Sequence, residues 1–192
     1  MIEIRIHGRG GQGAVVASQI IAEAAFREGM HVQAFPSFGS ERRGAPVAAF
    51  VRLDREPVLI RTEIYEPDGL IVLDQSLITQ KLVDVTQGVK EGAWVLINSG
   101  HEPAEFSNLG PFKIATVDAS RIAIEHRLGS MTSPIVNTAI LGAVCQLTGF
   151  VSLDSLGEAI RATVPIKPEA NVAAAVEAAA AVSVLAPQGV GR

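Results

Sequence analysis

Short runs of apolar residues recur along the chain, and glycine, proline or charged residues bound each of them. A continuous run such as residues 69–73 is typical of a strand that is buried on both faces of a sheet, and residues 94–97 repeat the pattern. We predict strands over residues 2–7, 31–35, 69–73, 94–97 and 113–117.

Two further extended segments are separated by a charged turn. Residues 45–53 and 57–61 flank the sequence Asp54-Arg55-Glu56. Two extended segments joined by a short polar turn favour an antiparallel hairpin. We therefore predict that a hairpin of these two segments makes the sheet mixed.

Apolar positions with helical spacing follow the first predicted strand and fill the last third of the chain. We predict helices over residues 14–27, 121–128, 135–147, 153–162 and 168–184. Strands that alternate with helices indicate an α/β protein. The expected fold is a three-layer α/β/α arrangement with a mixed, mostly parallel sheet, a Rossmann-like first βα unit and an antiparallel hairpin.

The length of 192 residues fits one domain, which we expect over residues 1–186, followed by a flexible C-terminal tail over residues 187–192. The composition is 48% hydrophobic and only 19% charged, so few charges are available to cover the surface. We therefore expect some apolar area to be buried against partner chains.

The charge pattern excludes several classes of partner. The net charge is −4, and no basic stripe with interleaved aromatic residues is present, so nucleic-acid binding is excluded. The chain does not start with a charged segment that precedes an apolar one, and the alanine-rich residues 171–186 are too short and too weakly apolar to span a bilayer. We expect no membrane contact and a cytoplasmic location.

The cysteine and histidine residues of the sequence do not indicate a metal site or a reactive thiol. The only cysteine, Cys145, lies in an apolar helical segment and is predicted to be a buried, inert thiol. One cysteine excludes an intramolecular disulfide and a four-cysteine cluster within this chain. His7, His31, His101 and His126 show no short metal-ligand spacing, so no metal site is expected.

A glycine-rich turn joins the first predicted strand to the first predicted helix, with the sequence Gly8-Arg9-Gly10-Gly11-Gln12-Gly13. Glycines at its first, third and sixth positions permit a tight turn and a close approach of a ligand to the main chain. The free N–H groups at the start of the following helix favour an anion such as phosphate. Arg9 and Gln12 add two side-chain donors.

The rest of a dinucleotide fingerprint is missing. An NAD site needs an acidic residue at the end of the second strand, but no carboxylate follows residues 31–35 until Glu41. NAD binding is therefore disfavoured. A turn that serves only to pack the helix against the strand stays open as an alternative.

A loop over residues 35–46 places Arg42 and Arg43 between glycines and aromatic residues. Arginine forks bind phosphate or carboxylate with two hydrogen bonds, and the aromatic residues could anchor a protein contact. An ordinary solvated loop, with Glu41 paired to an arginine, is an equal alternative. Asp74 and Asp118 each follow a predicted strand and precede a helical segment, which favours a helix N-cap role for both.

Four segments in this order resemble the gamma subunit of pyruvate (2-oxoacid):ferredoxin oxidoreductase. They are residues 7–14 (HGRGGQGA), 35–47 (FPSFGSERRGAPV), 64–68 (IYEPD) and 133–138 (SPIVNT). The resemblance runs nearly from end to end. Residues 171–175 are also similar to the last helix of that family, although the family often has a glutamate where this chain has alanine.

The resemblance implies a complex that decarboxylates a 2-oxoacid on thiamine diphosphate, passes electrons through iron–sulfur clusters to ferredoxin, and transfers the acyl group to coenzyme A. It further implies that alpha, beta and delta subunits carry the thiamine diphosphate, the magnesium ion and the 4Fe-4S clusters of a heterotetramer. The present chain has neither the cysteines nor the diphosphate motif for these groups, so we expect it to be non-catalytic alone.

The glycine turn and the arginine loop follow the ends of two predicted strands, and our hypothesis is that together they help to seat coenzyme A at a subunit interface. The candidate cofactor-binding residues are Gly8, Arg9, Gly10, Gly11, Gln12, Gly13, Ser40, Arg42 and Arg43. The rival hypothesis is that both loops lock the chain onto its partners. A free-standing phosphate- or nucleotide-binding regulatory module and the small subunit of indolepyruvate:ferredoxin oxidoreductase stay open as other functions.

Overall fold

Residues 1–37, 44–81 and 83–185 are described by the structure, which is a computed structural model. The strands of its main sheet are β1 (Ile2–Arg9), β2 (His31–Pro36), β3 (Pro46–Asp54), β4 (Gly69–Val72), β5 (Trp94–Asn98), β6 (Lys113–Val117) and β9 (Ser183–Leu185). The helices are α1 (Ala14–Arg27), α2 (Ser76–Thr79), η1 (Pro103–Leu109, a 3-10 helix), α3 (Ala119–Glu125), α4 (Ala139–Thr148), α5 (Leu153–Thr163) and α6 (Pro168–Ala181). A separate small hairpin consists of β7 (Gly129–Ser130) and β8 (Ser133–Pro134).

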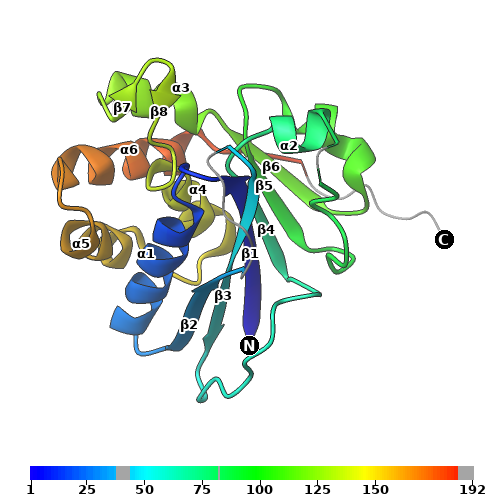
Figure 1. Cartoon of the computed structure of the whole chain (residues 1–192). Helices are drawn as coiled ribbons and strands as arrows, with labels where there is room; N and C mark the ends of the chain where they lie inside the picture. Colours follow the sequence, from blue (N-terminus) through cyan, green and yellow to red (C-terminus); the bar gives the residue numbers. More distant parts are fainter. Residues whose placement is uncertain (38–43, 82, 186–192) are drawn as a thin grey trace.

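The main sheet has the strand order β2-β3-β1-β4-β5-β6-β9 (Figure 1). β1, β4, β5 and β6 pair in parallel, and β2 has the same direction because β3 is antiparallel both to it and to β1. β3 and β9 run the opposite way. The predicted mixed, mostly parallel sheet is confirmed, and the carboxyl ends of its parallel strands meet at one edge.

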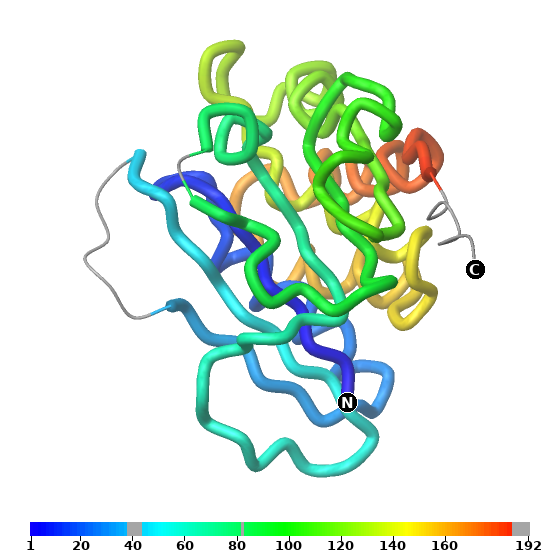
Figure 2. Tube along the Cα trace, turned by 90° about the vertical axis from the view of Figure 1, so that its right-hand side faces the viewer, coloured from blue at the N-terminus to red at the C-terminus, as the bar shows by residue number. Residues whose placement is uncertain are grey.

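Helices cover both faces of the sheet, as predicted for a three-layer fold. α1 and α3 to α6 lie on one face, and the shorter α2 and η1 lie on the other, which Figure 2 views from its outer side. β4 shows why both faces need a cover, because Ile71 packs into the core under α1 whereas Leu70 and Val72 pack into the core under α2 and η1. Continuous apolar strands are stable only with both faces buried.

The predicted hairpin is wrong in its second strand. Residues 45–53 form most of β3, but residues 57–61 form no strand, because β3 already pairs with β2 on one side and with β1 on the other. A side chain holds this segment instead of a strand ladder, since Gln33 Nε2 donates to the carbonyl oxygen of Ile60 at 2.9 Å. The antiparallel hairpin of the fold is therefore β2–β3.

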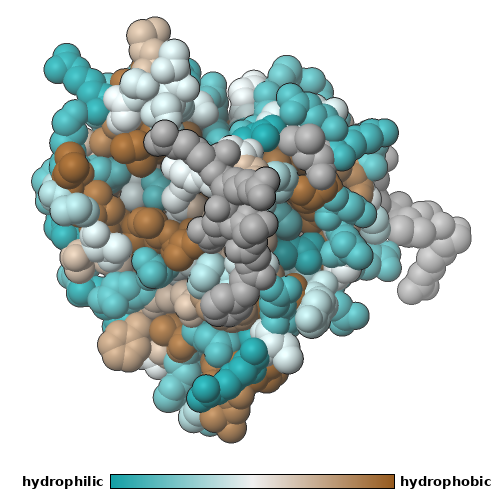
Figure 3. Space-filling view, in the orientation of Figure 1, coloured by the Kyte–Doolittle hydropathy of each residue, from teal (hydrophilic) through white to brown (hydrophobic). Residues whose placement is uncertain are grey.

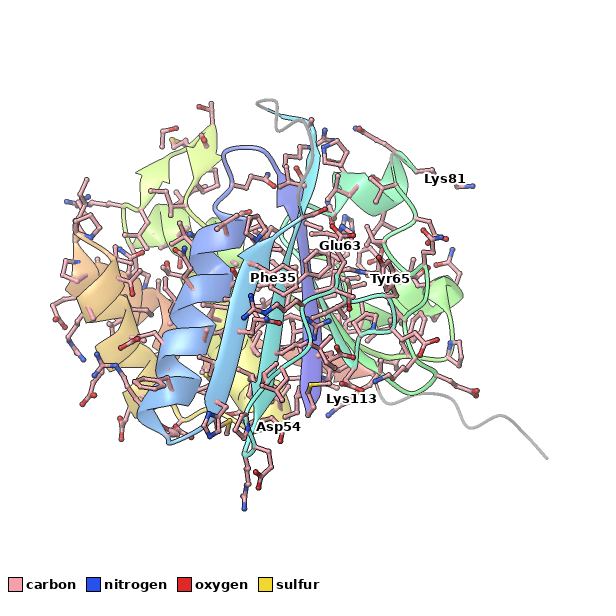
Figure 4. The ribbon with its side chains drawn as sticks, turned by 60° about the horizontal axis from the view of Figure 1, so that its bottom comes forward. Phe35, Asp54, Glu63, Tyr65, Lys81 and Lys113 are labelled. Atoms are coloured by element: carbon pink, nitrogen blue, oxygen red, sulfur yellow. The ribbon has the colours of Figure 1, made fainter. Side chains whose placement is uncertain are left out.

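A buried arginine secures the loop that crosses β2 and β3. Arg52 is only 1% exposed, and its Nε donates to Glu3 Oε1 at 2.8 Å. Its Nη2 donates to the carbonyl oxygen of Glu63 at 3.3 Å, and its guanidinium lies 5.5 Å from the ring centre of Phe35. Figure 4 shows Phe35 and Glu63 on this side of the sheet. A buried guanidinium of this kind is tolerated because an anion, carbonyls and an aromatic face satisfy it.

The other element boundaries differ at particular points. The predicted helix over residues 168–184 ends at Ala181, and residues 183–185 form β9 on the free edge of β6. The predicted helices over residues 121–128 and 135–147 are α3 and α4, and between them lies the unpredicted β7–β8 hairpin. α2 and η1 are too short for periodicity to reveal them. The predicted tail, residues 187–192, lies outside the described residues.

Small residues let α4 and α6 pack very closely. A Cβ atom on Gly142 would collide with the backbone carbonyl oxygen of Ala175. Ala143, Ala174 and Ala178 at the same contact have no exposed surface. Because a backbone carbonyl cannot move aside as a side chain can, this contact requires glycine at position 142.

Replacing Gly142 with alanine is expected to lower the free energy of unfolding by about 2 kcal/mol, the usual cost of overfilling a packed core. Urea denaturation of the isolated chain followed by circular dichroism measures this loss. Ala180→Ser, on the exposed face of α6, is the control and should change stability by less than about 0.5 kcal/mol. Equal stability of Gly142→Ala and the wild type would contradict the close contact.

Candidate functional site

A pocket of about 660 Å³ lies at the carboxyl edge of the parallel strands. Its walls come from the glycine turn before α1, the residues after β4, β5 and β6, and the segment that contains β8. Ligands of open α/β sheets bind in crevices at this edge, and polar groups from several strands converge there. The pocket is therefore the first candidate for a functional site.

The glycine turn has the geometry that the sequence predicted. Gly11 and Gly13 have φ values of +99° and +79°, a region that side chains disfavour. A Cβ atom on Gly8 would lie 3.2 Å from Leu73 Cδ1, and a Cβ atom on Gly13 would collide with the amide of Asn137. Gly13 is the N-cap of α1, and no side chain in the described part of the chain caps this helix end. Gly10 pairs with the chain before β3, because its N–H donates to the carbonyl oxygen of Ala45 at 2.8 Å.

Arg9 is engaged within the chain. Its Nε donates to Asp74 Oδ2 at 3.1 Å, and its Nη1 donates to the carbonyl oxygen of Gly44 at 3.1 Å. Its Nη2 donates to Ser76 Oγ at 2.8 Å and to Gln80 Oε1 at 3.2 Å. These four hydrogen bonds tie the end of β1 to Asp74, to α2 and its C-cap, and to Gly44, two residues before β3. The arrangement makes Arg9 an internal clamp, whereas the sequence had suggested a donor to a bound anion.

Gln12 and Asp74 complete the clamp. Gln12 Oε1 accepts from the Arg9 backbone N–H at 2.7 Å, and Gln12 Nε2 donates to Asp74 Oδ2 at 3.0 Å. Burial raises the pKa of Asp74, but hydrogen bonds from Ser76 and Gln12 and the charge of Arg9 outweigh it, so the pKa is lowered overall. Asp74 is therefore a carboxylate at neutral pH. Its Oδ1 also accepts from the Ser76 N–H at 2.9 Å, but the N-cap of α2 is Gln75, so the predicted N-cap role of Asp74 is wrong by one residue.

Asp118 and Asn98 form the next part of the wall. Asp118 Oδ1 accepts from the Arg121 N–H at 2.8 Å, which confirms the predicted N-cap role at α3. Asn98 Nδ2 donates to the carbonyl oxygen of Leu73 at 2.9 Å, and its Oδ1 accepts from the Ser120 N–H at 3.2 Å. The other carboxylate oxygen of Asp118, Oδ2, lies beside Gly100, which is also a residue of the pocket wall. Asn98 was not predicted as a functional residue, because an asparagine that follows a strand is equally common in turns.

Two amide oxygens in the wall have no hydrogen-bond donor among the described residues. They are Gln75 Oε1 and Asn137 Oδ1, and both atoms are buried. Buried polar atoms in native proteins almost always have a hydrogen-bond partner. Two buried oxygens without a donor in one pocket wall therefore indicate donors from outside the described chain. Both atoms have almost no exposed surface, so a ligand or a partner chain with N–H or O–H groups would reach them only after the two side chains turn toward the pocket.

The described wall carries carboxylates but no cation. Asp74 and Asp118 line the pocket, and neither Arg nor Lys does. The charge of Asp74 is compensated by Arg9, which lies behind it. The described wall is thus suited to neutral donors rather than to a phosphate. Ser40, Arg42 and Arg43, the other candidate anion-binding residues, lie outside the described residues.

His7 precedes the glycine turn but is not part of the pocket wall. It is 9% exposed, and its Nε2 has no partner among the described residues. Burial and the nearby charge of Arg5 lower the pKa of His7 to about 4. His7 is therefore neutral at pH 7, and the fold resists its protonation.

The chain matches proteins of one family along most of its length. Residues 3–181 match the model of pyruvate ferredoxin/flavodoxin oxidoreductase. The pyruvate/ketoisovalerate oxidoreductases common subunit gamma of Thermococcus kodakarensis is 56% identical over 166 residues, which cover 85% of this chain and 86% of the relative.

Solved structures agree with this family. Pyruvate oxidoreductase subunit PORC from Thermotoga maritima has a TM-score of 0.79 and 34% identity, and the match covers 95% of this chain and 97% of that chain. The 2-oxoglutarate:ferredoxin oxidoreductase from Magnetococcus marinus, with a TM-score of 0.67 and 24% identity, shares the fold over 93% of this chain and 30% of its own.

The chain therefore belongs to the pyruvate ferredoxin/flavodoxin oxidoreductase family. Within that family it is a gamma-type chain, one subunit of a multi-subunit oxidoreductase, as the sequence motifs had suggested. Its activity consequently depends on other subunits.

The sequence lacks the cysteines of an iron–sulfur cluster, and the described residues do not fit a metal site. Cys145 is the only cysteine of the sequence, and burial raises the pKa of its thiol to about 12. Over the described ranges, no group of three His, Cys, Asp or Glu side chains could hold a metal ion. In the same part of the chain no helix is long and apolar enough to cross a membrane. No redox step is derived from this chain.

The Arg9–Asp74 pair is expected to stabilise the fold more than an exposed pair does. A double-mutant cycle with Arg9→Ala, Asp74→Ala and the double variant should give a coupling energy of about 1–2 kcal/mol in urea denaturation. The Arg161–Glu169 pair is the control, because it has a similar distance of 2.8 Å but is largely exposed. Its coupling should stay below about 1 kcal/mol, and equal couplings would argue against the clamp.

His7 is expected to make the chain less stable in acid. The unfolded chain binds a proton near pH 6.5, whereas the folded chain resists it until about pH 4, so stability falls as the pH drops through this window. Between about pH 7.5 and about pH 5, His7 should cost about 2 kcal/mol of unfolding free energy. Urea denaturation at both pH values measures this loss of unfolding free energy. The loss should be smaller for His7→Gln than for the wild type, while the exposed control His31→Gln should lose as much as the wild type.

Proposed function

We propose that the chain is the gamma subunit of a 2-oxoacid:ferredoxin oxidoreductase, and that its edge pocket seats the uncharged part of coenzyme A at a subunit interface. The complex would convert a 2-oxoacid to acyl-coenzyme A and CO₂, with electrons passed to ferredoxin. The observation that carries the role of the pocket is the pair of buried, unpaired amide oxygens on Gln75 and Asn137.

The chemistry of coenzyme A suits these acceptors. Its pantetheine arm has two amide N–H groups, and its ribose and adenine add hydroxyl and amino donors. Gln75 and Asn137 each offer an amide oxygen, and Asp118 Oδ2 is a third acceptor in the same wall. The volume of about 660 Å³ lies in the ordinary range of small-molecule sites.

The phosphates of coenzyme A would lie outside the described wall. Carboxylates of Asp74 and Asp118 repel an anion, and Arg9 is occupied by its internal bonds. The segment that contains Ser40, Arg42 and Arg43 or a partner subunit would have to supply the cations. The free N–H groups of the α1 terminus next to Gly13 add a positive potential at the mouth of the pocket.

The remaining chemistry belongs to the partners in this proposal. Alpha, beta and delta chains would carry the thiamine diphosphate, the magnesium ion and the iron–sulfur clusters, in a cytoplasmic complex. The Thermococcus relative is named as a subunit common to pyruvate and ketoisovalerate oxidoreductases. We therefore propose that other subunits select the 2-oxoacid. A free-standing regulatory module has no support now that the family is known, and we propose the pyruvate type over the indolepyruvate type because the Thermococcus and Thermotoga relatives are named as pyruvate oxidoreductase subunits.

Gln75→Leu in the assembled complex is expected to raise the KM for coenzyme A about tenfold, because it removes one hydrogen-bond acceptor worth about 1–1.5 kcal/mol. The KM for the 2-oxoacid should not change. Steady-state oxidation of pyruvate with varied coenzyme A measures both constants.

Gln87→Leu is the matched control, since Gln87 is exposed and lies outside the pocket. An unchanged KM for coenzyme A, together with loss of partner subunits from Gln75→Leu, would show that the pocket binds a protein instead.

A further inference from the structure

A second hollow lies on the other side of the β8 segment from the edge pocket. It has a volume of about 420 Å³ and is bounded by α1, the β7–β8 hairpin and the loop between α5 and α6. We call it the α5–α6 groove, with the lining residues Val16, Leu128, Ile135, Asn137, Val164 and Ile166 used below. Figure 3 shows apolar atoms gathered on this side of the molecule, below the β7–β8 hairpin and beside α1.

The walls of the groove are apolar and open to solvent. Ile166 is 72% exposed, Ile135 is 48% exposed and Val16 is 38% exposed. Leu128 and Val164 form the floor between them. Several large apolar side chains around one hollow are uncommon on a surface that stays in water, and they are typical of a protein contact.

The charges around the groove have one sign. Arg127 and Lys167 line it, and no carboxylate does. Two acidic side chains of α6 are engaged elsewhere, because Glu169 pairs with Arg161 at 2.8 Å and Glu177 contacts His126 at 2.8 Å. The groove therefore complements a carboxylate next to an apolar group.

Both cations stand at backbone positions that glycine would occupy more easily. Arg127 has φ +55° at the end of α3, and Lys167 has φ +51° at the start of α6. Lys167 Nζ donates to the carbonyl oxygen of Arg127 at 2.7 Å, which joins the two sides of the groove. Strained backbone of this kind recurs at functional surfaces, where the side chain has a use that offsets the strain.

Asn137 adds a hydrogen-bond acceptor on the same floor. It is 6% exposed, lines the groove as well as the edge pocket, and its buried Oδ1 has no donor among the described residues. The proposal above assigns this oxygen to coenzyme A, so the docking of a partner segment depends on the apolar side chains of the groove and on its two cations.

We propose that the α5–α6 groove docks a segment of another subunit of the oxidoreductase, with an apolar side chain against Ile135 and Ile166 and a carboxylate between Arg127 and Lys167. The proposal rests on membership in a multi-subunit complex and is independent of the role in coenzyme A binding. The groove is thus an assembly surface that selects an acidic, apolar partner segment.

Two substitutions in the reconstituted complex test this surface. Ile166→Asp should weaken the association of this chain with its partners at least tenfold, and Lys167→Glu should weaken it most at low salt, where the charge attraction is least screened. Native mass spectrometry across a dilution series measures the assembled fraction. Phe26→Asp and Arg55→Glu are matched controls, because both residues are exposed and lie away from the groove.

A photocrosslinking amino acid at position 166 identifies the occupant. The expected product joins this chain to a partner subunit at a peptide that contains an apolar residue beside Asp or Glu. Thermal unfolding of the isolated Ile166→Asp variant should match the wild type, since the Ile166 side chain is mostly in water.

Other outcomes would overturn the proposal. Normal assembly of both variants, or equal loss in the controls, would show that the groove is not an interface. A crosslink to a second copy of this chain would assign the groove to self-association. If Gln75→Leu raises the KM for coenzyme A while Ile166→Asp assembles normally, the docking proposal alone is wrong.

Discussion

The strand pairing of β1 is the constraint on which the rest of the structure depends. β1 forms an antiparallel ladder with β3 along eight residue pairs and a parallel ladder with β4 on its other edge. Because both edges of β1 are paired, the chain must turn sharply after β1 to start α1. The positive φ values of Gly11 and Gly13 make this tight turn possible. The same pairing brings the start of β3 to the carboxyl edge, so Gly44 and Ala45 lie beside the glycine turn.

The Arg9 clamp changes how this edge should be understood. A glycine turn with an adjacent arginine suggests an anion site, yet the guanidinium makes four hydrogen bonds within the chain, to Asp74, Ser76, Gln80 and the carbonyl oxygen of Gly44. The clamp fixes the relative positions of β1, α2 and the residues before β3. The pocket wall includes two residues, Gln75 and Asn137, whose buried amide oxygens have no hydrogen-bond donor among the described residues.

The segment around β8 separates two surfaces of different chemistry. On one side lies the polar edge pocket, and on the other lies the apolar α5–α6 groove with its two cations. Ile135 and Asn137 line both. A partner chain that fills the groove would therefore contact the same short segment that borders the pocket. This gives a physical route by which assembly can shape the pocket.

The sequence by itself determined the α/β class, the position of α1, most strands and the gamma-type family, because apolar period, glycine placement and motif order are local properties of the chain. It could not determine which strand edge a segment finds. Residues 57–61 lost their predicted pairing because β3 was already paired on both sides, and residues 183–185 left the last helix for the free edge of β6. The roles of Arg9 and Gln75 were likewise decided by tertiary structure, because a side chain acts as a clamp or stays unpaired only through neighbours that lie distant in sequence or outside the chain.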